Sequence, residues 1–245
     1  MNMNFLALKD ISERFMEIVN PSSAEKMLKV GEIAGLKAGD RVIDYGCGFG
    51  ETLALWAEHF GVGGVGVDIR PYAATRAREK MARLGFADRI EIVCGSATDY
   101  PAEPHHFDVG ACIGATFAFG GYRETIHALK QVTKPGANLI LGEPYWRHPL
   151  VPAEFAATEH FHTEAELVKI THEEGYAFKG ILRSSEDDWD RYESGNWFGL
   201  IEWLKEHPGH PNEAEVRQHL LESQQEYFRF GRANIGWGMV VLSPV

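Results

Sequence analysis

The chain has 245 residues, which is long enough for one α/β domain with an insertion and for a sizeable buried core. It carries 24 Lys and Arg residues against 35 Asp and Glu residues, a formal net charge of −11. This is the wrong sign for holding a polyanion by counterion release. We therefore expect neither nucleic acid nor an acidic membrane surface as a partner.

The cysteines and the N-terminus indicate a cellular compartment. Cys47, Cys94 and Cys112 each lie in or beside an apolar, strand-like run, which is typical of buried free thiols in a reducing environment. Residues 1–10 have no basic region and too short an apolar run for export, and the charge-free stretch 109–122 is too short and glycine-rich to span a bilayer. We expect a cytoplasmic protein, whose oligomeric state the sequence does not indicate.

Residues 1–35 are predicted to form an N-terminal helical segment, with Ser22 and Glu25 in capping-box spacing. Strands and helices then alternate. Strands are expected at 41–46, 63–69, 90–97, 107–115 and 138–144, and helices from 51 to about 59, over 71–85 and over 123–133. Such alternation predicts crossover units and a mostly parallel sheet that is covered by helices on both faces.

This alternation ends at residue 145. Strand-like segments at 177–185 and 236–244 are expected to form an antiparallel pair at the sheet edge, with a largely helical stretch between them. The predicted fold class is α/β: a doubly wound, mostly parallel, seven-stranded, Rossmann-like sheet with an antiparallel edge strand and a helical cap insertion. We expect one domain over 1–245, with a helical segment (1–35), a ligand-binding core (36–145), a cap insertion (146–235) with a strand near 176–184, and a last strand (236–245).

The chain has glycines at 46, 48 and 50, between a predicted strand and a predicted helix. Missing Cβ atoms and positive φ angles let a ligand approach the backbone there. A dinucleotide fingerprint would have its third glycine at position 51, where Glu51 places a carboxylate that disfavours a pyrophosphate. A ligand with an ammonium, a sulfonium and a ribose avoids this repulsion. It would gain from Asp44 and from Asp68, an acid placed after the second strand to accept both ribose hydroxyls.

Four segments, 42–57, 64–69, 95–101 and 107–115, resemble the successive motifs of class I S-adenosylmethionine-dependent methyltransferases, in the family's order and spacing. The resemblance covers about residues 20–145. Segments 116–149 and 228–242 also resemble a poorly characterised group of small bacterial methyltransferases. The resemblance implies S-adenosylmethionine as the cofactor and 36–145 as its binding core.

Carried over by position, the resemblance places Gly46 and Gly48 around the methionine part of the cofactor, Asp68 at the ribose and Ile69 on the adenine, although Ile69 also fits an ordinary core position. Asp99 is either an adenine partner or a cap for the turn before Pro101. The cofactor-binding residues expected in this way are Asp44, Gly46, Cys47, Gly48, Asp68, Ile69, Ser96, Ala97, Thr98, Cys112 and Gly114.

Methyl transfer requires alignment of the nucleophile, and it requires a general base only if the nucleophile arrives protonated. The base candidates at the end of the fifth strand are Glu143 and His148; the alternatives are a structural carboxylate and an exposed loop histidine. The aromatic residues of the cap, at helical spacing, are either core or the wall of a substrate pocket. The residues expected to contact the substrate are Thr116, Tyr145, Trp146, Tyr192 and Trp197.

The sequence favours methyl transfer to a small-molecule acceptor, because the chain is acidic and has an aromatic cap. The alternatives are methylation of a protein or RNA, and a non-catalytic S-adenosylmethionine-binding protein. His160 and His162 have no second ligand cluster, so no metal site is predicted. The basic run 75–83 is expected to form a solvated helix face.

Overall fold

The first half of the chain forms the parallel part of one sheet. The computed structural model describes residues 3–156, 159 and 161–245. Its parallel strands are β1 (Arg41–Tyr45), β2 (Gly63–Asp68), β3 (Ile90–Cys94), β4 (Phe107–Ile113) and β5 (Thr133–Trp146). The central strands β1 and β4 are buried on both faces, as a sheet between two helical layers requires.

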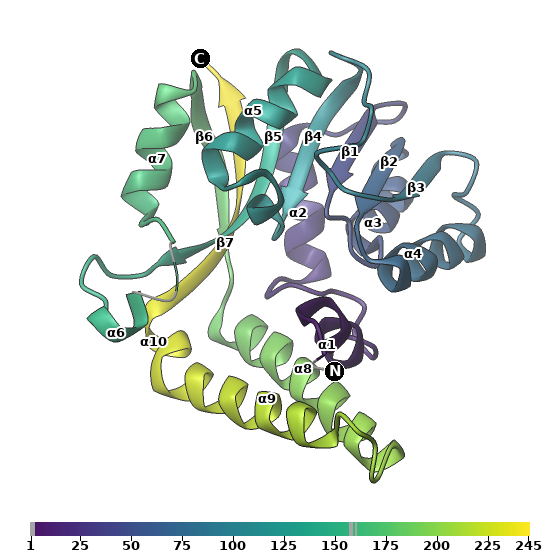
Figure 1. Cartoon of the computed structure of the whole chain (residues 1–245). Helices are drawn as coiled ribbons and strands as arrows, with labels where there is room; N and C mark the ends of the chain where they lie inside the picture. The colour runs from purple at the N-terminus through teal and green to yellow at the C-terminus, as the bar shows by residue number, and fades with distance from the viewer. Residues whose placement is uncertain (1–2, 157–158, 160) are drawn as a thin grey trace.

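Two late strands complete the sheet, whose order is β3-β2-β1-β4-β5-β7-β6 (Figure 1). Strand β7 (Ile235–Pro244) runs antiparallel to both β5 and β6 (Tyr176–Arg183). The predicted seven-stranded α/β fold and the antiparallel pair at the edge are therefore confirmed. Within the pair, β7 is the reversed strand and lies inside, while β6 forms the outer edge.

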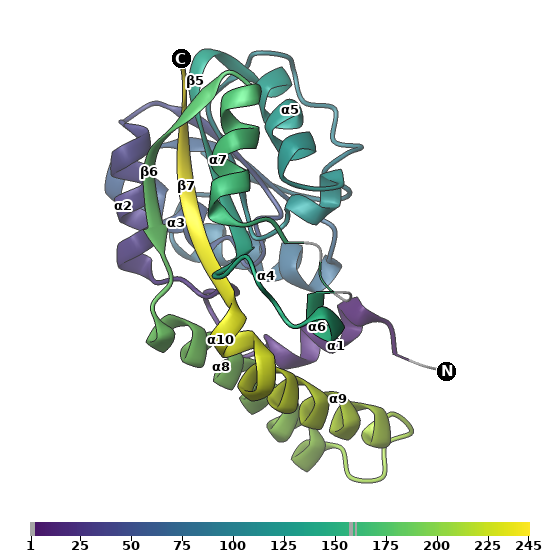
Figure 2. The same ribbon diagram turned by 90° about the vertical axis from the view of Figure 1, so that its left-hand side faces the viewer.

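Helices cover both faces of the sheet (Figure 2). Helices α2 (Ala24–Ala34), α3 (Glu51–Phe60) and α4 (Pro71–Arg83) pack on one face, around Met27, Trp56 and Met81. Helices α5 (Tyr122–Val132) and α7 (Glu164–Glu173) pack on the other, around Ile126 and Leu167. The two apolar clusters hold the carboxyl edge of the sheet in a fixed position.

Two expectations about local structure are wrong. Helix α2 is capped by Ser23, which accepts a hydrogen bond from the Lys26 backbone, whereas Ser22 is buried against Met239. The Cys94 side chain is exposed, because it ends the edge strand β3, where no further strand covers it; all three cysteines are free thiols.

The cap is built from two long helices, α8 (Glu186–Glu206) and α9 (Glu213–Glu226), which lie side by side beyond the carboxyl edge of the sheet (Figure 1). Five residues of π-helix, η2 (Tyr227–Gly231), and the short α10 (Arg232–Asn234) lead from α9 into β7. Two more short helices lie in connections, η1 (Thr116–Phe119) and α6 (Ala153–Ala156).

The N-terminal helix α1 (Phe5–Ser12) packs on α8. The contact is so close that a Cβ at Gly199 would lie 2.2 Å from the Ser12 carbonyl oxygen. The first helix is therefore part of the cap in space, although it is far from the cap in sequence. In the described part of the chain, no helix combines the length and apolar character that a bilayer span needs.

Candidate functional site

The glycine turn after β1 is held in a conformation that only glycine tolerates. The φ angles are +74° at Gly46, +55° at Gly48 and +72° at Gly50. A Cβ at Gly46 would lie 2.3 Å from the Cβ of Ala115, so the turn also packs against the loop after β4. The bare backbone thus packs closely on the loop after β4, and Gly46 also lines a small recess.

Asp68 ends β2 and is buried beside this turn. One carboxylate oxygen accepts the Gly48 N–H at 2.9 Å, and the other accepts the Arg70 N–H at 2.9 Å. Arg70 also forms an ion pair with Glu13 at 2.7 Å. The turn and the acid that the sequence placed in one site therefore do lie in direct contact.

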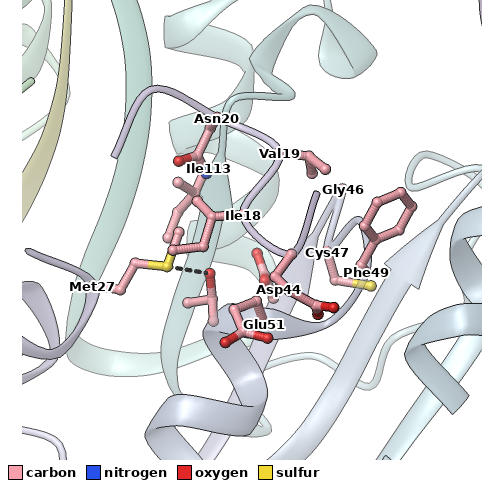
Figure 3. A pocket seen from close by; sticks show the side chains of 12 residues that line it. Ile18, Val19, Asn20, Met27, Asp44, Gly46, Cys47, Phe49, Glu51 and Ile113 are labelled. Carbon is pink, nitrogen blue, oxygen red and sulfur yellow. Dashed lines mark hydrogen bonds between the residues drawn. The ribbon is translucent and has the colours of Figure 1, made fainter. Parts of the chain in front are cut away.

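Asp44, at the bottom of the same site, has a buried oxygen, Oδ1, with no hydrogen-bond partner among the described residues. Burial and then the charge of Asp68 raise the pKa of Asp44 to about 7. Figure 3 shows Asp44 and Glu51 on one side of a small recess of about 20 Å³, with Ile18 and Val19 on the other. A cationic group placed here would pair with a carboxylate that the protein leaves unpaired.

Glu51, in the first turn of α3, has a cationic partner that the sequence did not reveal. It forms an ion pair with Lys80 of α4, and Lys80 also pairs with Glu17 at 2.6 Å. The prediction of a solvated basic face on α4 holds for the exposed Arg78 and Arg83. It is wrong for Lys80, which is buried, and for Arg76, whose guanidinium lies 4.0 Å from the centre of the Phe49 ring. These cations fix α4 against the turn and the N-terminal segment.

Residues after β2 and β3 form an open shelf next to Asp68. Ile69 is 58% exposed, so the core alternative for its side chain is wrong. The hydroxyls of Ser96 and Thr98 are 2.7 Å apart, Ala97 lies between them, and Thr98 also donates to Asp99 at 3.5 Å. None of these shelf residues lines the recess.

Two residues near the end of β4, Cys112 and Gly114, were expected at the cofactor, and the structure places them in different surroundings. Gly114 is exposed and lines the larger cavity described next. Cys112 is completely buried on the opposite face of the sheet, and burial keeps the pKa of its thiol well above the usual value. Its neighbour Ile113 lines the recess instead. The Cys47 thiol also lines the recess, and burial raises its pKa as well.

A cavity of about 760 Å³ lies between the carboxyl edge of the sheet and the cap. The sheet side contributes Gly114, Thr116, Glu143 and Trp237. The segment at Val19 and Asn20 lines both this cavity and the recess, so the two spaces are neighbours. The cap side contributes one face each of three helices: Phe5, Lys9 and Ser12 of α1; Trp189, Tyr192, Glu193, Asn196 and Leu200 of α8; His219, Ser223 and Glu226 of α9.

Glu143 is the buried acid at the sheet side of this cavity. It is 9% exposed and accepts a hydrogen bond from Thr116 Oγ1 at 2.5 Å. Burial raises the pKa of Glu143 to about 7, although the Thr116 hydrogen bond opposes the shift. A carboxylate with this pKa can accept a proton near neutral pH.

The other expected site residues are divided between the cavity and its surroundings. Tyr192 lines the cavity and accepts a hydrogen bond from Lys9 at 3.0 Å. Tyr145 is buried against Gly236, and Trp146 packs on Phe161, behind the wall. Neither belongs to the described lining, because the strand end turns their rings toward neighbouring elements.

Trp197 and His148 are also outside the described lining. The Trp197 ring packs on the Tyr227 ring, with 5.7 Å between the ring centres. The preceding residue, Asn196, lines the cavity, whereas Trp197 does not. His148 is exposed in the loop after β5, as the alternative interpretation expected.

The structure adds cavity residues that sequence reasoning missed, above all Lys9, Ser12 and Glu193. A signal for Glu193 was present, because it lies four residues after Trp189 and therefore on the same helix face. No comparable signal existed for α1, which reaches the cavity only through tertiary packing. Among the described residues no group of three potential metal ligands occurs, and His160 lies outside them.

Comparisons with known proteins agree with this geometry. A family model described as a methyltransferase domain matches residues 42–136. The uncharacterised protein YjhP of Escherichia coli (strain K12) is 34% identical over 238 residues, 95% of this chain and 96% of that protein. A SAM-dependent methyltransferase from Geobacter sulfurreducens, in complex with S-adenosyl-L-homocysteine, superposes with a TM-score of 0.92 at 32% identity, covering 100% of this chain and 99% of that one. The ubiquinone/menaquinone biosynthesis C-methyltransferase UbiE of Pseudomonas putida is 33% identical over 119 residues, 46% of this chain and 44% of that enzyme.

Proposed function

The chain belongs to the S-adenosylmethionine-dependent methyltransferases, and we propose that it methylates a small-molecule acceptor held between the sheet and the cap. The family, the enzyme class and the S-adenosylmethionine cofactor, all expected from the sequence, are confirmed by the comparisons. The observation that carries the acceptor proposal is the 760 Å³ cavity, which α1, α8 and α9 cover. Its neighbour, the recess of about 20 Å³ at the glycine turn, has room for one small cationic group of the cofactor beside Asp44.

The residues at the glycine turn fit the cofactor. The unpartnered oxygen of Asp44 can accept a hydrogen bond from its ammonium group or compensate the positive sulfur, and Gly46 leaves the approach free of a side chain. Lys80 and Arg70 already have carboxylate partners and do not neutralise Asp44. We propose that Gly46, Cys47 and Gly48 surround the methionine part.

The nucleoside end fits the shelf beside Asp68. Each Asp68 oxygen accepts one backbone N–H and retains a further lone pair, so the carboxylate can also accept the ribose hydroxyls. The exposed Ile69 offers an apolar surface for the adenine, and Ser96 and Thr98 offer hydroxyls at its edge. The position of Cys112 allows a contact through its backbone but not through its buried thiol.

The chemistry on the acceptor side falls to Glu143. The bound cofactor supplies the methyl group on an electrophilic sulfonium. Glu143 lies at the sheet side of the acceptor cavity, where it can take a proton from an incoming O–H or N–H group, while Thr116 fixes the orientation of its carboxylate. The cap excludes water and holds the acceptor for in-line attack. His148, exposed in its loop, is not part of this proposal.

The proposal is tested by following a labelled methyl group. The full chain is incubated with methyl-labelled S-adenosylmethionine and, separately, with the metabolite, protein and RNA fractions of one cell extract. We expect label in the metabolite fraction alone, and a loss of at least about tenfold in rate for Glu143→Gln. Glu91→Gln on the exposed side of β3 makes the same charge change far from the cavity and should leave the rate unchanged.

Label in the protein or RNA fraction would contradict a small-molecule acceptor. Tight cofactor binding without transfer to any fraction would instead favour a binding protein without turnover. A cytoplasmic location, with no nucleic-acid or membrane partner, stays a prediction from the sequence.

A further inference from the structure

The described lining of the large cavity carries an excess of negative groups. Lys9 is the one Lys or Arg residue in that lining, against the carboxylates of Glu143, Glu193 and Glu226. Glu159 also lines the cavity but already interacts with another residue. Lys9 is already engaged, because its ammonium group donates to Tyr192 at 3.0 Å and lies 3.4 Å from a Glu13 oxygen. An acceptor entering this cavity meets carboxylates rather than an available cation.

Glu143 places one of these carboxylates on the sheet-side wall of the cavity. Its side chain is nine-tenths buried and only Oε2 has a partner, the Thr116 hydroxyl. The second oxygen, Oε1, has no hydrogen-bond partner among the described residues. A carboxylate oxygen that is open to a cavity can accept a charge-assisted hydrogen bond from a ligand.

Glu193 presents a second acid from the opposite wall. It lies on the face of α8 that meets the cavity, next to Tyr192 and one turn after Trp189. The described residues provide no ion-pair partner within 4.0 Å and no hydrogen bond to its carboxylate. Burial raises the pKa of Glu193 to about 7, and Lys9 only partly opposes this shift.

Aromatic rings line the same cavity as these acids. Trp189 and Tyr192 lie 6.3 Å apart between ring centres, and Trp189 and Tyr227 lie 6.4 Å apart. All three line the cavity, as does Trp237 on the sheet side. Faces of Trp and Tyr attract a cation, and the Tyr192 ring already has the Lys9 ammonium 5.4 Å from its centre, so of this pair Trp189 remains for a ligand cation. A carboxylate on the same wall adds a charge-assisted hydrogen bond. An anionic group would meet like charge and an electron-rich wall.

We propose that the methyl acceptor is a small organic amine, whose ammonium group binds Glu193 of the cap on the Trp189 side of the cavity. This inference rests on the proposed function, since it assigns the cavity to the acceptor. The cap side recognises the basic nitrogen, and the sheet side, with Glu143 and Gly114, receives the atom that is methylated. Acceptors recognised through a carboxylate, phosphate or sulfate are excluded by the same charges.

The test compares three probes that share a phenyl group and differ in charge: phenethylamine, phenethyl alcohol and hydrocinnamate. Each is titrated by calorimetry into the full chain saturated with S-adenosylhomocysteine, so that the cofactor site cannot take up the probe. We expect phenethylamine to bind about tenfold or more tightly than the alcohol, and hydrocinnamate to bind most weakly.

A charge-neutral variant identifies the acid. Glu193→Gln should lower phenethylamine affinity about tenfold and leave phenethyl alcohol within about twofold. Glu202→Gln, on the same helix but paired with Lys205 at the surface, makes the same charge change and should alter neither value. Equal binding of amine and alcohol, preference for hydrocinnamate, absence of phenethylamine binding, or an equal loss for both probes in Glu193→Gln would each overturn the proposal.

The labelled-methyl experiment separates this proposal from the proposed function. Label found only on metabolites without a basic nitrogen would overturn the amine assignment and leave small-molecule methylation intact. Selective, Glu193-dependent phenethylamine binding with label in the protein or RNA fraction would support the amine site and contradict the proposed function.

Discussion

The glycine-turn side and the cap side of the site handle charge in opposite ways. Around the turn, the cations are matched within the protein: Arg70 with Glu13 and Lys80 with Glu51. Asp44 is left with an unpartnered oxygen. Across the cavity, Glu143 and Glu193 face the ligand space with few partners. The turn is therefore preorganised for one ligand, whereas the cap leaves much of its charge balance to the acceptor.

The two sides also differ in what builds them. The turn uses backbone geometry, with positive φ angles and missing Cβ atoms within a few residues of sequence. The cap side uses side chains on one face each of α1, α8 and α9, which come from opposite ends of the chain. Substitutions in the turn should therefore affect cofactor binding, and substitutions that unseat the cap should affect acceptor turnover alone.

The largest effect is expected for Gly46→Ala. The new methyl group would lie 2.3 Å from the Cβ of Ala115 at a φ of +74°, so the turn and the loop after β4 must move apart. We expect affinity for S-adenosylhomocysteine to fall at least about a hundredfold by calorimetry, as for other displacements of about 1 Å in a preorganised site. Gly85→Ala is the matched control: its φ is +75°, but no atom lies within 4 Å of the new methyl group.

If both alanine variants lost affinity equally, the backbone conformation rather than the close approach would explain the effect. If neither lost affinity, the assignment of the turn to the cofactor would be wrong.

A smaller but still large effect is expected for Asp68→Ala. The variant removes hydrogen bonds to a charged acceptor worth about 1.5–3 kcal/mol, so cofactor affinity should fall at least about tenfold. Asp88→Ala, in an exposed turn before β3, serves as the control. Circular dichroism on the same samples separates lost ligand contacts from a disordered turn, because Asp68 also accepts the Gly48 and Arg70 N–H groups. Unchanged calorimetric affinity would remove Asp68 from the cofactor site.

Gly199→Ala perturbs the cap and therefore tests whether the cap side and the glycine-turn side act independently. A Cβ there would lie 2.2 Å from the Ser12 carbonyl oxygen, so α1 must separate from α8. We expect methyl transfer to fall about fivefold, because the acceptor is held less well, with cofactor affinity within about twofold of the wild type. Ser194→Ala, exposed on the same helix, is the control. Parallel losses of cofactor affinity and turnover would show that the two sides are not independent.

The sequence was sufficient for the turn side, because local chemistry encodes it. Gly46, Gly48 and Asp68 follow strand ends, and parallel strands bring their carboxyl ends to one edge, so their contact followed from the order of elements. The antiparallel pairing of β6 and β7 was likewise predicted from the sequence. The Cys112 side chain was harder to assign, because the neighbouring position, Ile113, points to the site and strand alternation reverses with each residue.

Long-range pairs could not be predicted. Glu51 and Lys80 lie on different helices, as do Ser12 and Gly199, and no periodicity relates either pair. In sequence the basic run on α4 resembles a solvated face, because its partners in the N-terminal segment, such as Glu17, are far away along the chain. Trp197 lies four residues after Glu193, so helix spacing could not exclude it from the cavity; its packing on Tyr227 decides its position.

The smallest effect expected concerns stability, for Asp44→Asn. Burial and Asp68 raise the pKa of Asp44 from 3.8 to about 7 in the folded protein. The folded state therefore holds this proton more tightly than the unfolded chain. The protonated Asp44 carboxyl therefore contributes its full stabilisation of the fold below about pH 4. This stabilisation is lost as the pH rises through 7, where the buried group must ionise.

Asn cannot ionise, so the variant avoids this loss. We expect it to gain on the order of 1 kcal/mol or more in unfolding free energy over the wild type at about pH 8 and to gain little at about pH 4. Urea unfolding at both pH values measures the difference. Because a cationic cofactor group would compensate the Asp44 carboxylate, saturating S-adenosylmethionine should abolish the gain at the higher pH. A gain independent of both pH and ligand would mean that Asp44 is an ordinary buried residue.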